Sequence, residues 1–76
     1  MVQVICGNNV TRSKVIVDEN NTTPRMVLEN SGIDYSVGTT HLDGATLQIG
    51  EMDKTLAELG VTTKCYLLNV RKADNA

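Results

Sequence analysis

The sequence has no Phe and no Trp, and only two Tyr among its 76 residues. Any hydrophobic core must therefore be built from aliphatic side chains, each worth about 1.5–3 kcal/mol when fully buried. Apolar residues make up 41% of the chain, which is ordinary for a globular protein and high for a disordered one. This length allows one small domain with a single core.

Basic residues are few and scattered: seven Lys and Arg stand against nine Asp and Glu, which gives a net charge of −2. A nucleic-acid surface requires clustered basic residues, and proteins that bind single strands add aromatic side chains on which bases stack. The sequence has neither feature, so we do not expect a nucleic-acid partner.

Long apolar runs are also missing. No run approaches the ~20 residues needed to cross a bilayer, so no membrane partner is expected. The apolar stretch at the N-terminus is short, contains Gln3 and Cys6, and has no basic residues before it, which is not typical of a signal peptide. We therefore expect a cytoplasmic protein with reduced thiols.

Only two cysteines and one histidine are present, which leaves little material for a metal or redox centre. Cys6 and Cys65 have no further Cys or His at ligand spacing, so we expect neither a metal nor a cofactor. A nucleophilic cysteine needs a base or a helix N-terminus to lower its pKa, and a strand end offers neither. His41 has only scattered carboxylates near it in the sequence, such as Asp43. The sequence thus predicts a protein without enzymatic activity.

The first two β-rich runs predict an antiparallel hairpin. Residues 2–6 end at Gly7-Asn8-Asn9, residue types that favour turns, and residues 10–17 then alternate in character. Because the side with Arg12 and Lys14 must face water, Val15 and Val17 should face the core.

A short helix should follow the hairpin. Thr23 is a suitable N-cap, Pro24 suits the first helical position, and Gly32 is typical of the residue after a helix end. Val27 and Leu28 would form the apolar face, with Ile33 docking just past the end. A helix of about two turns is unstable alone, so it must pack on the sheet.

The second half predicts three more strands and a helical turn. The third strand is expected at residues 39–42, before the Asp43-Gly44 turn, and a short fourth strand at residues 45–49. Residues 53–61 should form one helical turn capped by Gly60, and residues 65–70 a central strand. The resulting order, β-β-α-β-β-turn-β, predicts an α+β fold with a mixed sheet and one main helix on one face.

This order resembles the β-grasp plan of ubiquitin-like proteins over residues 1–72, which leaves residues 73–76 as a polar tail. The closest match is the stretch from Asp53 to Val61, which resembles the family's Asp-x-x-Thr-Leu turn before the last strand. The resemblance implies that Thr55 caps this turn and that Leu56 and Val61 are buried.

The C-terminus departs from the family. Conjugated ubiquitin-like proteins and the related sulfur carriers end in Gly-Gly, whereas this chain ends Arg-Lys-Ala-Asp-Asn-Ala. A modifier or sulfur-carrier function would need a processed C-terminus, and it is kept as an alternative.

In ubiquitin-like domains the sheet face opposite the helix carries the patch on which partners dock. Strand alternation predicts that Val2, Val4 and Cys6 face the core, together with Tyr66, Leu68 and Val70 of the last strand. Cys65, Leu67 and Asn69 would then face outward, with the two cysteines on opposite faces and unable to form a disulfide. The predicted partner-binding residues are Ile5, Arg12, Lys14, His41, Lys64 and Leu67. If the register were shifted by one residue, Ile5 and Leu67 would instead belong to the core.

The sequence therefore predicts a non-catalytic, unconjugated ubiquitin-like protein that binds another protein through the open sheet face, as a monomer or weak homodimer. Besides the modifier or sulfur carrier, two alternatives remain. One is a homo-oligomeric structural subunit joined through the same patch or by strand edges. The other is a small redox or metal protein that uses the two thiols.

Overall fold

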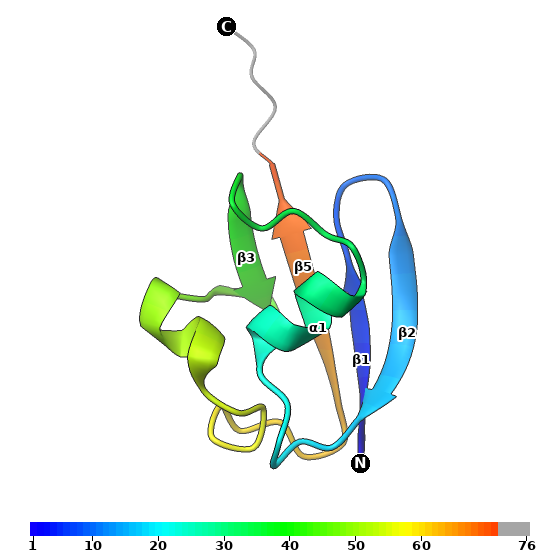
Figure 1. Ribbon diagram of the computed structural model, residues 1–76, viewed down its shortest axis with the longest axis vertical. Helices are drawn as coiled ribbons and strands as arrows, with labels where there is room; N and C mark the ends of the chain where they lie inside the picture. The colour runs from blue at the N-terminus through cyan, green and yellow to red at the C-terminus, as the bar shows by residue number, and fades with distance from the viewer. Residues whose placement is uncertain (72–76) are drawn as a thin grey trace, which may run out of the picture.

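The computed structural model, which describes residues 1–71, shows a mixed five-stranded sheet with one α-helix packed on one face (Figure 1). The elements in chain order are β1 (Val2–Gly7), β2 (Arg12–Val17), α1 (Pro24–Asn30), β3 (Thr39–Leu42), β4 (Ala45–Thr46), the 3₁₀ helix η1 (Ile49–Asp53) and β5 (Lys64–Val70). The strand order is β2-β1-β5-β3-β4, with β1 and β5 parallel and the other pairs antiparallel. This α+β architecture is compatible with the expected β-grasp plan. The predicted tail at 73–76 lies outside the described residues.

The predicted hairpin of β1 and β2 is confirmed. Its turn is organised by Asn8, whose Oδ1 accepts hydrogen bonds from the backbone N–H groups of Val10 (2.8 Å) and Thr11 (2.9 Å). Val4 lies opposite Val15 across the pair, and Val2 lies opposite Val17. Val15 and Val17 pack against the core, as the alternation of β2 predicts.

The helix also begins and ends where its capping residues predict. The Thr23 hydroxyl accepts a hydrogen bond from the Met26 N–H at 3.2 Å. Gly32 follows the helix end with a φ of 72°, a conformation that favours glycine. Val27 and Leu28 are buried, and α1 is thereby held on β1 and η1.

The segment between β3 and β5 differs from the prediction. The fourth strand was expected to reach residue 49, but β4 contains only two residues and η1 begins at Ile49. A local interaction ends the strand: the Gln48 N–H donates to Glu51 Oε1 at 2.9 Å, the carboxylate half of a capping box. The later turn agrees with the prediction, because Thr55 caps it through Glu58 N–H (3.2 Å) and Leu56 is fully buried.

The predicted orientation of β5 is wrong by one residue. Cys65, Leu67 and Asn69 are buried, whereas Tyr66 and Val70 are 42% and 40% exposed. The parallel pairing with β1 fixes this orientation, since it places Cys65 beside Val4 and Leu67 beside Cys6. Side chains at paired positions of a sheet share a face, so β5 buries the residues that lie beside the buried residues of β1.

Asn69, which the predicted alternation of β5 placed on the outer side, is a buried polar residue of this strand. Its Nδ2 donates to the backbone oxygen of Val37 (3.0 Å) and to Thr40 Oγ1 (3.3 Å). A buried amide is tolerated when it is hydrogen-bonded. These bonds join the end of β5 to the loop before β3, a tertiary contact that the sequence pattern does not indicate.

The core is aliphatic, as the composition requires, and both cysteines belong to it. The prediction that Cys6 and Cys65 face opposite sides is therefore wrong. Both thiols are free, and Cys6 lies beside Leu67, two positions along β5 from Cys65. The buried apolar residues are Val2, Val4, Cys6, Val27, Leu28, Ile33, Met52, Leu56, Val61, Cys65 and Leu67.

The helix cap gives a first prediction. Replacing Thr23 by Ala removes the acceptor for the Met26 N–H, and we expect the free energy of unfolding to fall by about 1 kcal/mol. Urea unfolding followed by circular dichroism measures the change. Thr62→Ala is the matched control, since Thr62 is exposed and caps no helix. Equal stability of the two variants would contradict the capping role.

The register of β5 gives a second prediction. Leu67→Ala should lower the free energy of unfolding by about 2–5 kcal/mol, because it leaves a cavity in the core. Leu68→Ala, one residue away on the opposite face, should cost about 1 kcal/mol or less. Urea unfolding of both variants tests the assignment, and a larger loss for Leu68→Ala would mean that the register is shifted.

Candidate docking surface on the open sheet face

The helix-free side of the sheet is the outer face, defined by the strand positions that point away from α1. Helices α1 and η1 lie on the other side of the sheet (Figure 1). Alternation along the paired strands gives the members of the outer face. They are Gln3, Ile5, Arg12, Lys14, Ile16, Thr39, His41, Thr46, Lys64, Tyr66, Leu68 and Val70.

Most of the predicted partner-binding residues lie on this face, with one correction. Leu67 has no exposed surface and belongs to the core, so it cannot contact a partner. The structure places the other five on the outer face: Ile5, Arg12, Lys14, His41 and Lys64.

The sequence reasoning missed three outer-face residues because the error in the β5 register assigned them to the core: Tyr66, Leu68 and Val70. Tyr66 lies beside Ile5 on the neighbouring strand, and Leu68 lies opposite His41. Pairing the last strand with the already assigned alternation of β1 would have found them. Ile5, Tyr66 and Leu68 form the apolar centre of the outer face.

The tyrosine is flanked by a cation. The Lys64 ammonium lies 5.0 Å from the centroid of the Tyr66 ring, within the range of a cation–π contact. On the other side of β5, the backbone of Tyr66 is held by Asp43, whose Oδ1 accepts the Tyr66 N–H at 2.8 Å. The ring is thus presented on a central strand with its backbone tied to the β3–β4 turn.

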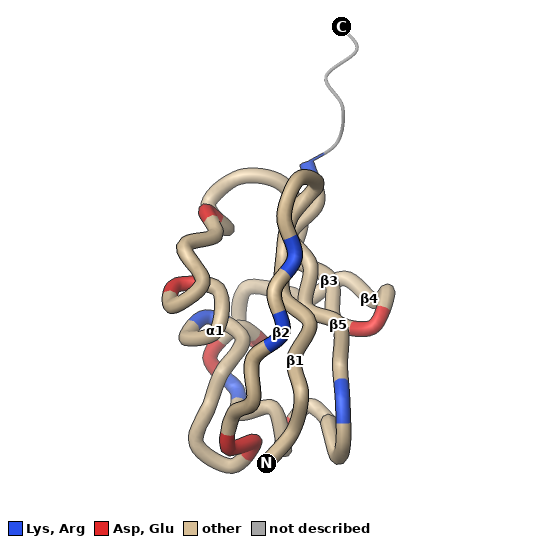
Figure 2. The backbone as a smooth tube through the Cα atoms, turned by 90° about the vertical axis from the view of Figure 1, so that its right-hand side faces the viewer, with Lys and Arg blue, Asp and Glu red and all other residues tan. Residues whose placement is uncertain are grey.

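Charge is unevenly divided between the two sides of the sheet. The outer-face positions carry Arg12, Lys14 and Lys64 and no Asp or Glu, although the whole chain has a net charge of −2. Figure 2 shows basic segments on β2 and at the start of β5, with others near α1 and after β5, while acidic segments lie on the helix side and in the turns. The side chains of the outer face therefore carry a net positive charge, opposite in sign to that of the whole chain.

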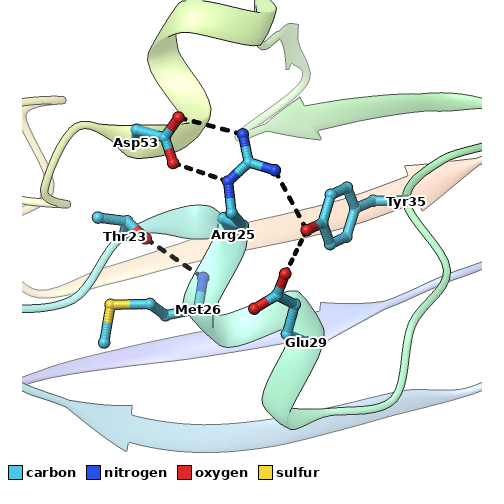
Figure 3. Close-up of polar contacts among 6 residues, drawn as sticks. All are labelled: Thr23, Arg25, Met26, Glu29, Tyr35 and Asp53. Atoms are coloured by element: carbon cyan, nitrogen blue, oxygen red, sulfur yellow. Dashed lines mark hydrogen bonds and ion pairs between the residues drawn. The ribbon is translucent and has the colours of Figure 1, made fainter.

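A second polar cluster lies on the helix side, around Arg25 (Figure 3). Its guanidinium donates to both carboxylate oxygens of Asp53, at 2.7 and 3.1 Å, and to the Tyr35 hydroxyl at 3.2 Å. The Tyr35 hydroxyl in turn donates to Glu29. Arg25 lowers the pKa of Asp53 and has its own pKa raised by the same pairing. The cluster joins α1, η1 and the loop after α1. Arg25 is paired with Asp53, and Glu29 is hydrogen-bonded to the Tyr35 hydroxyl.

The two thiols are both free and buried in the core. Burial, together with the charges of Asp43 and Cys6, raises the pKa of Cys65 to about 11. A thiol with this pKa is protonated at neutral pH and is a poor nucleophile. Cys6 Sγ lies 3.0 Å from Ser31 Oγ, where the two groups share a hydrogen bond.

Within residues 1–71 no three His, Cys, Asp or Glu side chains lie close enough together to hold a metal ion. No helix in this range is long and apolar enough to cross a membrane. Comparison of the chain with family models, curated proteins and solved structures found no match. A function must therefore be argued from the chemistry of the chain's own surface.

The pKa of Cys65 gives a third prediction. The folded protein keeps this proton up to about pH 11, whereas the unfolded chain releases it near the ordinary pKa of 9.0. Unfolding thus releases a proton in this window, so stability is fully present below pH 9.0 and falls as the pH rises towards 11. The slope should reach at most about 1.4 kcal/mol per pH unit.

The comparison is with Cys65→Val, which lacks the thiol but retains every Tyr and Lys that also titrates in this range. Urea unfolding of both proteins between pH 8 and pH 11 gives the difference in stability. The wild-type protein should lose stability relative to the variant as the pH rises. Parallel pH profiles would contradict the raised pKa.

Proposed function

We propose that this protein is a ubiquitin-like β-grasp module that binds another protein without catalysis and without conjugation, through the outer face of its sheet. The observation that carries the proposal is the composition of that face. An apolar centre of Ile5, Tyr66 and Leu68 lies among the basic side chains of the face, and the helix covers only the other side of the sheet. These basic side chains, which we call the basic frame, are Arg12, Lys14 and Lys64.

The apolar centre has the character of a protein contact surface. Tyr66 is 42% exposed, and Ile16 and Val70 beside this centre are 57% and 40% exposed. Tyr is among the residues that contribute most binding energy in interfaces, since it buries a large area at low entropic cost. A side chain held on a central strand loses little further freedom when it is covered by a partner.

The positive charge of the basic frame indicates the charge expected on the partner's surface. Arg12, Lys14 and Lys64 favour a surface in which Asp and Glu surround an apolar side chain. Such complementary charge mainly accelerates association and excludes like-charged partners, and its effect weakens as salt is added. The proposed partner is therefore an acidic protein surface with an apolar centre.

The same charge disfavours a second copy of the chain on this face. Face-to-face pairing of two copies would bring two sets of these cations together, at an electrostatic cost. The free edge of β2 also carries Arg12 and Lys14, residue types that oppose strand-edge pairing. These observations favour a monomer, or at most a weak homodimer, over a homo-oligomeric structural subunit. We place this protein in the cytoplasm, in agreement with its two free, buried thiols.

The fourth prediction concerns binding through this face. We expect Leu68→Ala to weaken the affinity for a partner isolated with the wild-type protein at least about tenfold, a typical loss for a central interface residue. Lys14→Glu should weaken it as well and should reduce its dependence on salt. Ile49→Ala is the matched control, because Ile49 is 85% exposed and lies in η1, away from the outer face.

The measurement begins with capture of partners by the tagged protein from its own cells, under native and denaturing conditions, followed by titration of the purified pair by calorimetry. Circular dichroism verifies that each variant is folded. Equal affinity of Leu68→Ala and the wild type would overturn the assignment of this face. Heavier species that survive denaturation, attached through the C-terminal end of the chain, would instead support the modifier alternative.

A further inference from the structure

A cleft of about 460 Å³ lies at the end of the domain opposite the N-terminus. Three segments that are distant in sequence meet there: the β1–β2 turn, the residues that follow α1, and the C-terminal end of β5 (Figure 1). Its volume is within the range of small-molecule sites. The lining residues are Asn8, Asn9, Val10, Gly32, Asp34, Asn69 and Arg71.

The cleft contains an unpaired polar atom on a buried side chain. Asn69 is only 2% exposed, and both of its hydrogen bonds use Nδ2, towards Val37 and Thr40. The amide cannot be turned around, since the Val37 backbone oxygen requires a donor. Asn69 Oδ1 has no hydrogen-bond partner among residues 1–71, and it is not among the fully enclosed unpaired atoms there. Because Asn69 lines the cleft, this accessible oxygen is positioned to act there as an acceptor.

Two opposite charges border the same space. The Arg71 backbone is fixed by the side chain of Asn9, whose Oδ1 accepts its N–H at 3.1 Å and whose Nδ2 donates to its oxygen at 3.3 Å. The Arg71 guanidinium has no ion pair within the described part of the chain. Asp34 uses Oδ1 to accept from the backbone N–H and hydroxyl of Ser36, which leaves Oδ2 available. The hydrogen bonds from Ser36 lower the pKa of Asp34, and the positive charge of Arg71 lowers it further.

We propose that this cleft binds a small zwitterionic ligand of the amino-acid or short-peptide type. The ligand's carboxylate would accept hydrogen bonds from the Arg71 guanidinium, and its ammonium group would donate to Asn69 Oδ1 and Asp34 Oδ2. Guanidinium suits carboxylate because its donors match the two oxygens. A ligand with only one charge leaves either Arg71 or Asp34 uncompensated. The site does not depend on the outer face, with which it shares no residue.

The test is a titration of the full chain with dialanine, followed by ¹H–¹⁵N NMR. Saturable shifts are expected for the backbone amides of Asn8, Gly32 and Asp34, and for the side-chain Nδ2 signals of Asn69. N-acetyl-dialanine, which has only the negative charge, and dialanine amide, which has only the positive charge, should each bind at least about tenfold more weakly.

Variants that each replace one charged side chain of the cleft by a neutral one complete the test. Arg71→Gln and Asp34→Asn should each reduce dialanine affinity at least about tenfold, and both leave the backbone and loop hydrogen bonds in place. Lys54→Gln, an exposed charge in another segment, should have no effect. Absence of saturable shifts, equal binding of the singly charged probes, or unchanged binding by both variants would overturn the proposal.

Discussion

The parallel pairing of β1 with β5 is the constraint on which the rest of the structure depends. These strands lie at the centre of the sheet, and their register decides which residues of β5 share a face with Val4 and Cys6. A shift of one residue would reverse every side chain of β5 between the two faces. The core would then lose Leu67, and the outer face would lose both Tyr66 and Leu68. Stability and surface chemistry are therefore set by the same pairing.

Local signals explain what the sequence predicted correctly. The Asn8 turn, the Thr23 cap and Gly32 act on neighbouring backbone groups, so their effect can be read from a few adjacent residues. The orientation of β5 depends on β1, about 60 positions earlier in the chain. Its run of apolar residues does not alternate cleanly, and the one polar residue within it, Asn69, is buried by tertiary hydrogen bonds. The predicted fourth strand was too long because the prediction did not include the Gln48–Glu51 interaction, which competes with strand pairing.

The candidate docking surface was likewise predicted correctly on the first hairpin and wrongly on β5. Ile5, Arg12 and Lys14 were placed correctly because the first hairpin alternates clearly, while Leu67 was placed wrongly with the rest of β5. The correction changes the chemistry of the surface as well as its membership. An aliphatic contact is replaced by Tyr66, an aromatic ring with Lys64 above it. The corrected face therefore presents an aromatic ring beside a cation, where the predicted face had a leucine.

Asn69 links the core to the proposed ligand cleft. An aliphatic side chain at this position would add to the core, whereas an amide with one unpaired atom costs free energy unless that atom finds a partner. Its Nδ2 hydrogen bonds offset part of this cost by fixing the loop before β3. Its oxygen, which has no hydrogen-bond partner within residues 1–71, belongs to a residue that lines the cleft together with Asp34 and Arg71. Because β5 alternates, it supplies Tyr66 and Leu68 to one face and Asn69 to this cleft, so one strand register determines both the proposed docking face and the proposed ligand site.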